Sequence, residues 1–243
     1  MPQDLICHHE NDGIHHIALN RPKKRNALNI AMMKSLTALL NTINAINTSK
    51  GILITANGPA FSAGADLSEM KERPSEITHA LLDLVAALEK NQLMMNIMIE
   101  EDVFAGAHIL IGFAHSVMAL ESVRFKLPEV ERGIWPFLVM SVLKRSMPHK
   151  HAWKMMLTAK ALDATKACHY GLISDVEDSK DALNQRVNEW SQMVRSLDVT
   201  TVKRATHAWS KLDELSYVDG HSMCGKLLLE TLQHSEATSL LDF

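Results

Sequence analysis

This sequence has little cysteine and no long apolar run. Cys7, Cys168 and Cys224 are far apart and odd in number among 243 residues, which argues against a disulfide framework and favours a reducing compartment. No uninterrupted apolar run approaches the roughly 18 residues that a membrane-spanning helix needs. The N-terminus lacks a basic region followed by an apolar core, so no signal peptide is expected. These absences predict a cytoplasmic protein without a membrane span.

An excess of positive charge is also missing. The formal net charge is -3, which leaves no basic surface for nucleic acid or an anionic membrane. A hydrophobic content of 47% and a charged content of 22% are ordinary for a globular protein. The length suffices for a large core. We therefore expect one large domain, or one domain with a small appendage.

Apolar patterning predicts strands and helices in alternation, followed by helices alone. Asn29 is expected to cap a helix that runs to about Ile46, and Pro74 is expected to open another that runs to about Lys90. The pattern therefore predicts an α/β fold with a helical C-terminal part. The expected strands are 4–9, 14–20, 51–55, 93–99, 115–120, 123–127 and 172–174, and the other expected helices are 136–146, 148–157, 164–170 and most of the chain after 181.

Two pairs of histidines, His8-His9 and His15-His16, fall in the first two expected strands. Neighbouring residues of a strand point to opposite faces of a sheet, so neither pair can chelate a metal from one side. We expect solvated or packed histidines here and no metal site.

The organising segment is a loop of small residues between an expected strand and an expected helix. It runs from Thr55 to Leu67 and contains Gly58, Pro59 and Gly64. Because almost no side chain stands in the way, the backbone N–H groups of such a loop can approach a ligand closely. A tight connection without a ligand role would explain the composition equally well.

Five motifs in the chain, taken together, favour the ligand role. The residues Ala60 to Leu67 resemble the signature of the crotonase (enoyl-CoA hydratase/isomerase) superfamily. The other four are similar to further motifs of that family and occur in the same order. They are Leu19-Asn20-Arg21-Pro22 with Asn26-Ala27-Leu28, then Phe125 to Val130, then Gly133 to Pro136, and finally Leu157-Thr158 with Ala167 to Leu172. The resemblance covers roughly residues 14 to 235.

The resemblance implies a fold and an assembly. The fold is a crotonase-like spiral of β-β-α turns followed by a helical C-terminal part. We expect residues 1–190 to form the acyl-CoA-binding core and residues 191–243 to form a helical region that makes a homotrimer or a dimer of trimers. The segment after Ala237 is short for the last helix that the resemblance implies.

The resemblance also implies the catalytic groups. Acyl-CoA chemistry through an enolate-like anion needs two N–H donors at the thioester oxygen. These roles are implied for the backbone N–H of Ala65 and of Gly106. Glu129 matches a catalytic glutamate of the family, and its apolar neighbours in sequence would raise its pKa towards values useful for an acid/base. From the sequence around it alone, Glu129 is better explained as a surface residue that starts a helix.

Residues near the coenzyme A moiety are implied in the same way. Lys24 and Arg25 would face its phosphates, and Ala27, Ala63, Asp66 and Leu67 would line its path. Coenzyme A is then part of the substrate, and no separate cofactor is expected.

One departure from the family separates the candidate reactions. Hydratases of the family activate water with two carboxylates, and the second carboxylate position is occupied here by Ile109. This favours isomerisation of a 3-enoyl-CoA to a 2-enoyl-CoA with Glu129 as the only acid/base. An enoyl-CoA hydratase that uses an acid from Glu100 to Asp102, and a non-catalytic acyl-CoA binder, remain open alternatives. Dehalogenases that are related to this family place an aspartate nucleophile near the position of Phe137. No aspartate occupies that position here, which argues against dehalogenation.

Overall fold

The computed structural model describes residues 4–233, and its main layer is a sheet of six strands in the order β1-β2-β3-β4-β6-β9. Strands β1 and β2 are antiparallel, and each later pair in the sheet is parallel. The bounds are β1 Ile6–Asn11, β2 Ile14–Leu19, β3 Gly51–Ala56, β4 Met94–Ile99, β6 Ser116–Leu120 and β9 Asp175–Glu177. The segment after Ala237 lies outside the described residues.

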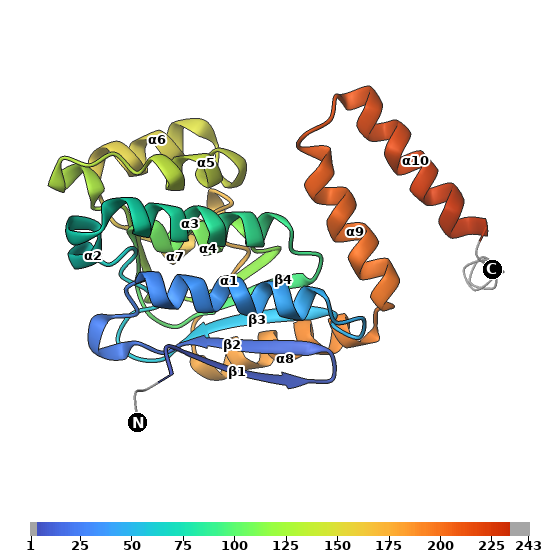
Figure 1. Ribbon diagram of the computed structural model, residues 1–243, viewed down its shortest axis with the longest axis horizontal. Coiled ribbons are helices and arrows are strands. Elements are labelled where there is room, and N and C mark those ends of the chain that lie inside the picture. Colours follow the sequence, from blue (N-terminus) through green and yellow to red (C-terminus); the bar gives the residue numbers. More distant parts are fainter. Residues whose placement is uncertain (1–3, 234–243) are drawn as a thin grey trace.

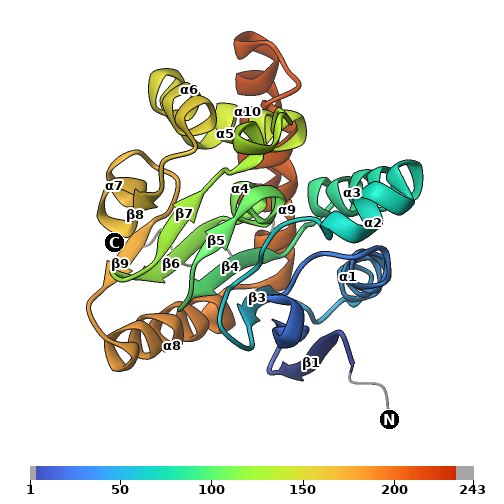
Figure 2. The same ribbon diagram turned by 90° about the vertical axis from the view of Figure 1, so that its left-hand side faces the viewer.

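A second sheet of three short strands lies beside the first, in the order β5-β7-β8 (Figure 2). Its strands are β5 Val103–Phe104, β7 Arg124–Lys126 and β8 Leu162–Asp163. Strands β5 and β7 are parallel, whereas β7 and β8 are antiparallel. The predicted α/β fold with a helical C-terminal part is thus confirmed, and its strands form two mixed sheets.

Helices cover both faces of the large sheet. Helices α1 (Ile30–Asn44) and α3 (Pro74–Glu89) pack together on one face, and α8 (Lys180–Ser196) covers the other (Figures 1 and 2). As predicted, the Asn29 side chain caps α1 by accepting a 3.0 Å hydrogen bond from the Met32 N–H. The remaining helices are α2 Leu67–Glu72, α4 His108–Phe113, α5 Phe137–Ser146, α6 His149–Thr158, α7 Ala164–His169, α9 Val199–Leu212 and α10 Tyr217–Gln233, with 3-10 helices η1 Pro22–Lys24, η2 Ala105–Ala107 and η3 Glu129–Arg132.

The strand predicted at residues 172–174 is wrong. Gly171 follows α7 in the left-handed conformation, with φ +79°, which a glycine adopts readily at the end of a helix. The next residues, Leu172 and Ile173, are buried but do not pair, and β9 begins only at Asp175. An apolar pair after a helix end therefore marks a core contact here and not a strand.

Helices α9 and α10 extend from the body as an arm (Figure 1). Two side chains of α9 fasten it to the core: the Lys203 ammonium donates to the Ile46 carbonyl at 2.9 Å, and the Thr206 hydroxyl donates to the Gln92 carbonyl at 2.7 Å. Within the described part of the chain, no helix is long and apolar enough to span a bilayer.

The β1–β2 hairpin pairs its histidines across the strands. The ring of His8 stacks on that of His15 with centroids 5.3 Å apart, and the ring of His9 stacks on that of His16 at 4.6 Å. The His15 Nδ1 atom lies 3.1 Å from the His8 Nε2 atom, and the His15 Nε2 atom lies 2.7 Å from the hydroxyl oxygen of the buried Ser49. Among residues 4–233, no three His, Cys, Asp or Glu side chains are arranged to hold a metal.

Protonation of these histidines is disfavoured in the folded protein. Burial lowers the pKa of His8, His15 and His16, and each is lowered further by a neighbouring histidine. Arg195 adds to the effect at His16, whereas Glu10 opposes it at His8 and His15. A pKa below the ordinary value of 6.5 means that the unfolded chain takes up protons first as the pH falls.

We therefore expect the free energy of unfolding to decrease as the pH falls below about 6.5. The buried His108, and His115, whose ring accepts from the Met95 N–H, also have pKa values lowered by desolvation and contribute in the same direction. Urea unfolding at about pH 7.5 and about pH 5.5 measures the loss. A His8→Gln, His16→Gln double variant should lose less stability between the two conditions than the wild type. An exposed-site control, His79→Gln, should behave like the wild type, and equal wild-type stability at both pH values would contradict the expectation.

Candidate active site

The candidate site lies where three parallel segments end at one edge of the smaller layer. Ser62 pairs with Val103 in a parallel bridge, and Val103 pairs with Phe125 in the parallel β5–β7 ladder. Because parallel neighbours end at the same edge of a sheet, the turns that follow these segments lie together. Ala65, Gly106 and Glu129 are in those turns. The topology therefore brings together the three residues predicted as catalytic.

The amide groups of Ala65 and Gly106 lie side by side. A Cβ atom placed on Gly106 would lie 3.7 Å from the Ala65 nitrogen, and nothing else would come within 4 Å of it. No acceptor is found among the described residues for the Ala65 N–H or for the Gly106 N–H. Two unpaired donors beside open space can hold a carbonyl oxygen that gains negative charge.

Gly64 brings the two turns into contact. Its φ is +81°, and a Cβ atom there would lie 2.5 Å from the Ala105 Cβ and 2.9 Å from the Gly106 nitrogen. Such distances exclude any side chain at this position. The small-residue loop signals a close backbone approach, but the identity of the segment approached becomes visible only in the fold.

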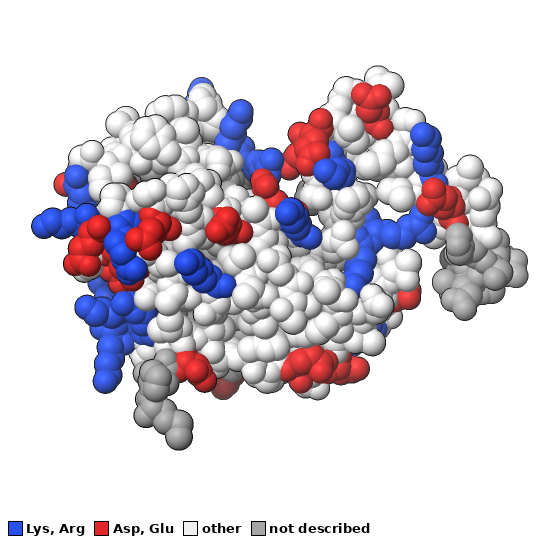
Figure 3. All heavy atoms as spheres, in the orientation of Figure 1, with Lys and Arg blue, Asp and Glu red and all other residues white. Residues whose placement is uncertain are grey.

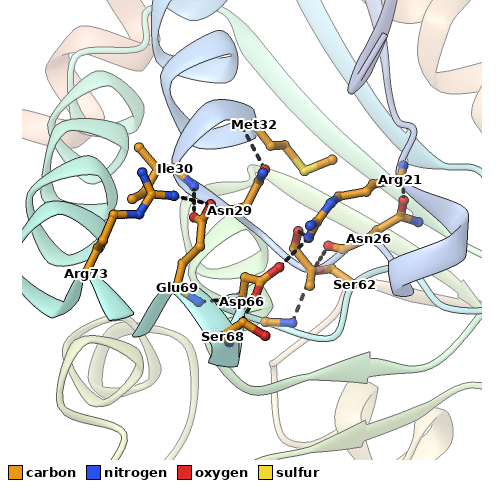
Figure 4. Close-up of polar contacts among 12 residues, drawn as sticks. Arg21, Asn26, Asn29, Ile30, Met32, Ser62, Asp66, Ser68, Glu69 and Arg73 are labelled. Carbon is orange, nitrogen blue, oxygen red and sulfur yellow. Dashed lines mark hydrogen bonds and ion pairs between the residues drawn. The ribbon is translucent and has the colours of Figure 1, made fainter. Parts of the chain in front are cut away.

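A buried polar network holds the 57–66 loop in place (Figure 4). The Asn26 amide donates to the carbonyls of Asn57 and Ala60, at 2.9 Å each, and accepts from the Arg21 N–H at 2.7 Å. The Ser62 hydroxyl donates to the Asn26 carbonyl at 2.7 Å. Both Asn26 and Ser62 are completely buried. Sequence reasoning assigned neither a role, because a buried polar side chain has no local signature.

Asp66 uses its side chain inside the protein. Its Oδ2 atom accepts from Arg21 at 2.6 Å, and its Oδ1 atom caps α2 by accepting from the Ser68 and Glu69 amides. Burial favours the neutral acid, but the Arg21 hydrogen bond and the two amides outweigh it and lower the pKa of Asp66. Leu67, the next residue, is 52% exposed. Because both carboxylate oxygens of Asp66 have partners inside the protein, only the main chain of this residue is left to contact a ligand.

Glu129 is half-buried at the start of η3. Burial raises its pKa, while its own backbone N–H and Arg132 act in the opposite direction. Within residues 4–233, the buried Oε2 atom of Glu129 has no hydrogen-bond partner. An unpartnered carboxylate oxygen with a raised pKa is suited to exchanging a proton with a ligand.

The predicted cationic loop forms η1 and lies on the surface. Lys and Arg side chains gather at the left-hand end of the molecule in Figure 3, where the loop before α1 lies in Figure 1. The Arg25 guanidinium stands over the Phe104 ring, 4.8 Å from its centroid, and the Arg25 carbonyl accepts from the Ala63 N–H at 2.8 Å. Lys24 is exposed, and the Ala27 carbonyl accepts from Arg21 at 3.1 Å. The loop is thus tied to the segments that precede Ala65 and Gly106.

Ile109 and the three acids have structural surroundings. Ile109 is 1% exposed within the core. Glu100 pairs with Lys180 at 3.2 Å, and the Asp102 carboxylate accepts from the Arg124 N–H at 2.8 Å. Glu101 is exposed and, with Glu100, lines a cavity of about 190 Å³ at the ends of β3 and β4. Two of the three acids therefore anchor neighbouring segments.

His108 is a further polar side chain of the site to which sequence reasoning assigned no role. It follows the Gly106 turn, is completely buried, and has one ring nitrogen 2.8 Å from the Ala105 carbonyl. The ring packs edge-on against Phe125, with centroids 6.1 Å apart.

The fold and site define an α/β protein with two adjacent backbone donors and a carboxylate. The Enoyl-CoA hydratase/isomerase family profile matches residues 9–238, so the chain belongs to that family. The chain is 31% identical over 204 residues to the Danio rerio protein named "Enoyl-CoA hydratase domain-containing protein 3, mitochondrial", covering 79% of this chain and 71% of that protein. It is 34% identical over 186 residues to the 2,3-dehydroadipyl-CoA hydratase of Escherichia coli K12, covering 74% of this chain and 71% of that one.

Solved structures share the fold. The crystal structure of human enoyl Coenzyme A hydratase domain-containing protein 3 matches with a TM-score of 0.89 at 24% identity, covering 94% of this chain and 92% of that one. An enoyl-CoA hydratase of Mycobacterium smegmatis matches with a TM-score of 0.91 at 20% identity, covering 96% and 92% of the two chains. The chain thus has the crotonase fold.

Proposed function

We propose that this protein moves the double bond of a 3-enoyl-CoA thioester to give the conjugated 2-enoyl-CoA. The observation that carries the proposal is Glu129, a half-buried carboxylate with an unpartnered oxygen beside the turns of Ala65 and Gly106. Family membership supports an acyl-CoA thioester as the substrate. The buried Ile109 at the second carboxylate position supports isomerisation over hydration.

The reaction needs one group that takes up a proton and gives it back. The Glu129 carboxylate removes a proton from C2, and the electron pair moves into the thioester carbonyl to give a dienolate. The N–H groups of Ala65 and Gly106 bind the resulting oxyanion, and each donor of this kind contributes about 3–4 kcal/mol to lowering the barrier. The protonated Glu129 then delivers the proton to C4, and the double bond forms between C2 and C3. No water is consumed, so one carboxylate suffices.

The raised pKa of Glu129 suits this cycle. A C2 proton next to a thioester is only weakly acidic, and a more basic carboxylate removes it more readily. Burial supplies the rise in pKa, because it disfavours the charged form.

Coenzyme A binding is assigned to the loop before α1 and to the 63–67 segment. Lys24 and Arg25 would meet the phosphates, and the main chain at Ala27, Ala63, Asp66 and Leu67 would line the path towards Ala65. The exposed cations of η1 and the direct Arg25–Ala63 hydrogen bond support this assignment.

Hydration of a 2-enoyl-CoA is the second candidate. The observation that favours it is the 34% identity to a relative named 2,3-dehydroadipyl-CoA hydratase. Such a reaction would require an acid besides Glu129, and Glu100 and Asp102 already have partners in the fold.

We also propose a homotrimer or a dimer of trimers, with residues 1–190 as the core and 191–243 as the assembling region. Within the described chain, α10 buries only Gly220, and its Tyr217 and Val218 are 81% and 75% exposed. An apolar helix face of this kind needs a protein surface to cover it. Sedimentation velocity should report three or six chains, and a monomer would contradict the assembly.

The test of the function is the ultraviolet absorbance of a conjugated thioester. A panel of 3-enoyl-CoA esters of different chain lengths is mixed with the protein, and the absorbance of 2-enoyl-CoA is followed with time. We expect it to rise with at least one ester. Silence across the panel, with bound ester detected by calorimetry, would overturn the isomerase and leave a hydratase of 2-enoyl-CoA or a non-catalytic binder.

A further inference from the structure

The residue before Gly106 has an unusual backbone conformation. Ala105 has φ +51°, in the left-handed region that non-glycine residues rarely adopt. The Cβ atom of Ala105 lies directly beside Gly64, and a Cβ atom on Gly64 would be only 2.5 Å from it. An isolated chain would relax Ala105 to negative φ, so neighbouring groups must hold this turn in place.

The His108 side chain holds this turn through a hydrogen bond to Ala105. Its Nδ1 atom lies 2.8 Å from the Ala105 carbonyl oxygen, and a carbonyl can only accept, so Nδ1 carries the hydrogen. Complete burial lowers the pKa of His108 to about 4, so the ring is neutral at neutral pH and this tautomer is defined. The edge contact with Phe125 fixes the plane of the ring. The other ring nitrogen, Nε2, is buried and has no hydrogen-bond partner among the described residues. The contact of Nδ1 with Ala105 is therefore the hydrogen bond that orients the ring.

The Ala105 carbonyl and the Gly106 N–H belong to one peptide group. A trans peptide is planar, and its C=O and N–H point in opposite directions, so fixing the oxygen fixes the direction of the N–H. Rotation of this peptide would turn the Gly106 N–H away from its place beside the Ala65 amide. The hydrogen bond from His108 opposes that rotation.

We propose that His108 is a positioning residue: by holding the Ala105 carbonyl, it aims the Gly106 N–H at the thioester oxygen of the substrate. The proposal rests on the proposed function, because it assigns a cause to the geometry of the donor pair. His108 does not touch the substrate, since no part of its side chain is exposed.

Two amide substitutions separate positioning from simple packing. In His108→Asn the side-chain nitrogen can take the place of Nδ1 and donate to the Ala105 carbonyl. In His108→Gln the amide extends one bond further, towards the place of Nε2, and loses this contact. Both variants are polar and keep a donor, so a role in packing alone predicts similar effects for the two.

The readout is the carbonyl stretching frequency of bound butyryl-CoA labelled with ¹³C at the thioester carbon. This ester has no double bond to move, so the measurement does not depend on turnover. We expect the wild type and His108→Asn to lower the frequency relative to free ester, and His108→Gln to lose a large part of that shift. With a reactive 3-enoyl-CoA, kcat should fall up to about 10²-fold in His108→Gln at a similar KM, and much less in His108→Asn.

Each outcome has one meaning. If His108→Gln folds, binds the ester and keeps the wild-type shift and kcat, the positioning role is overturned. If Asn and Gln lose the shift and kcat equally, the hydrogen bond to Ala105 is not the cause and the proposal also fails. If the wild type itself binds the ester without any shift, the donor pair of the proposed function fails instead. His108→Leu adds a variant without any donor and should resemble His108→Gln.

Discussion

Replacement of Glu129 by Gln is expected to reduce the turnover of a 3-enoyl-CoA thioester by about 10³-fold, with little change in its dissociation constant. Gln has the same shape but cannot accept and return a proton. The carboxylate has no partner at Oε2 among the described residues, so its removal breaks no hydrogen bond at that atom. The loss should appear in kcat, because proton transfer takes place after binding. Stopped-flow absorbance of the conjugated product measures it.

Glu131→Gln is the matched control for this substitution. Glu131 belongs to the same 3-10 helix, and its carboxylate is exposed and pairs with Lys126 at 2.9 Å on the surface. A surface ion pair of this type contributes at most about 1 kcal/mol, so Glu131→Gln should keep nearly full turnover. Turnover by Glu129→Gln within tenfold of the wild type would exclude Glu129 as the acid/base.

Replacement of Gly64 by Ala is expected to damage stability and activity together. The new methyl group would lie 2.5 Å from the Ala105 Cβ, 2.9 Å from the Gly106 nitrogen and 3.0 Å from the Phe104 carbonyl, and a φ of +81° adds backbone strain. The turns that carry Ala65 and Gly106 must move apart to admit it. We expect a loss of about 2–4 kcal/mol in the free energy of unfolding, and at least a 10²-fold loss of kcat in the protein that still folds. Urea unfolding and steady-state kinetics measure the two effects.

Gly133→Ala separates the clash from the strain. Gly133 also has positive φ, +70°, but a Cβ there would meet nothing within 4 Å. It should therefore cost only about 1 kcal/mol of stability, the backbone term alone. Equal losses for the two alanine variants would show that the contact between Gly64 and the Ala105–Gly106 turn carries no special weight.

Local chemistry made much of the fold predictable. Asn29, followed by apolar residues at helical spacing, marks the start of α1, and the expected strands 4–9 and 14–20 mark the approximate positions of β1 and β2. Strands β5 and β8 were not predicted, because a strand of two residues has no periodicity and exists only through its pairing with β7. The strand expected at Leu172 failed for the related reason that burial alone does not distinguish a strand from a loop.

The candidate site shows the same division. The family resemblance selected Ala65, Gly106 and Glu129 as candidates, while their placement at one edge follows from the Ser62–Val103–Phe125 pairing. Sequence reasoning did not find the groups that hold the turns. Asn26 and His108 act through carbonyls brought near by folding, at Ala60 and Ala105 respectively, and neither type of residue marks such a role in a single sequence.

The most direct test of the central claim is the mass of the product formed from a 3-enoyl-CoA in ordinary water. Chromatography with mass spectrometry separates the outcomes, because isomerisation leaves the mass unchanged and hydration adds the mass of one water molecule. We predict an early product with the mass of the substrate and the absorbance of a conjugated thioester, absent with Glu129→Gln. A 3-enoyl-CoA that stays unchanged, while a 2-enoyl-CoA given to the same protein gains the mass of one water, would contradict the single-carboxylate isomerase.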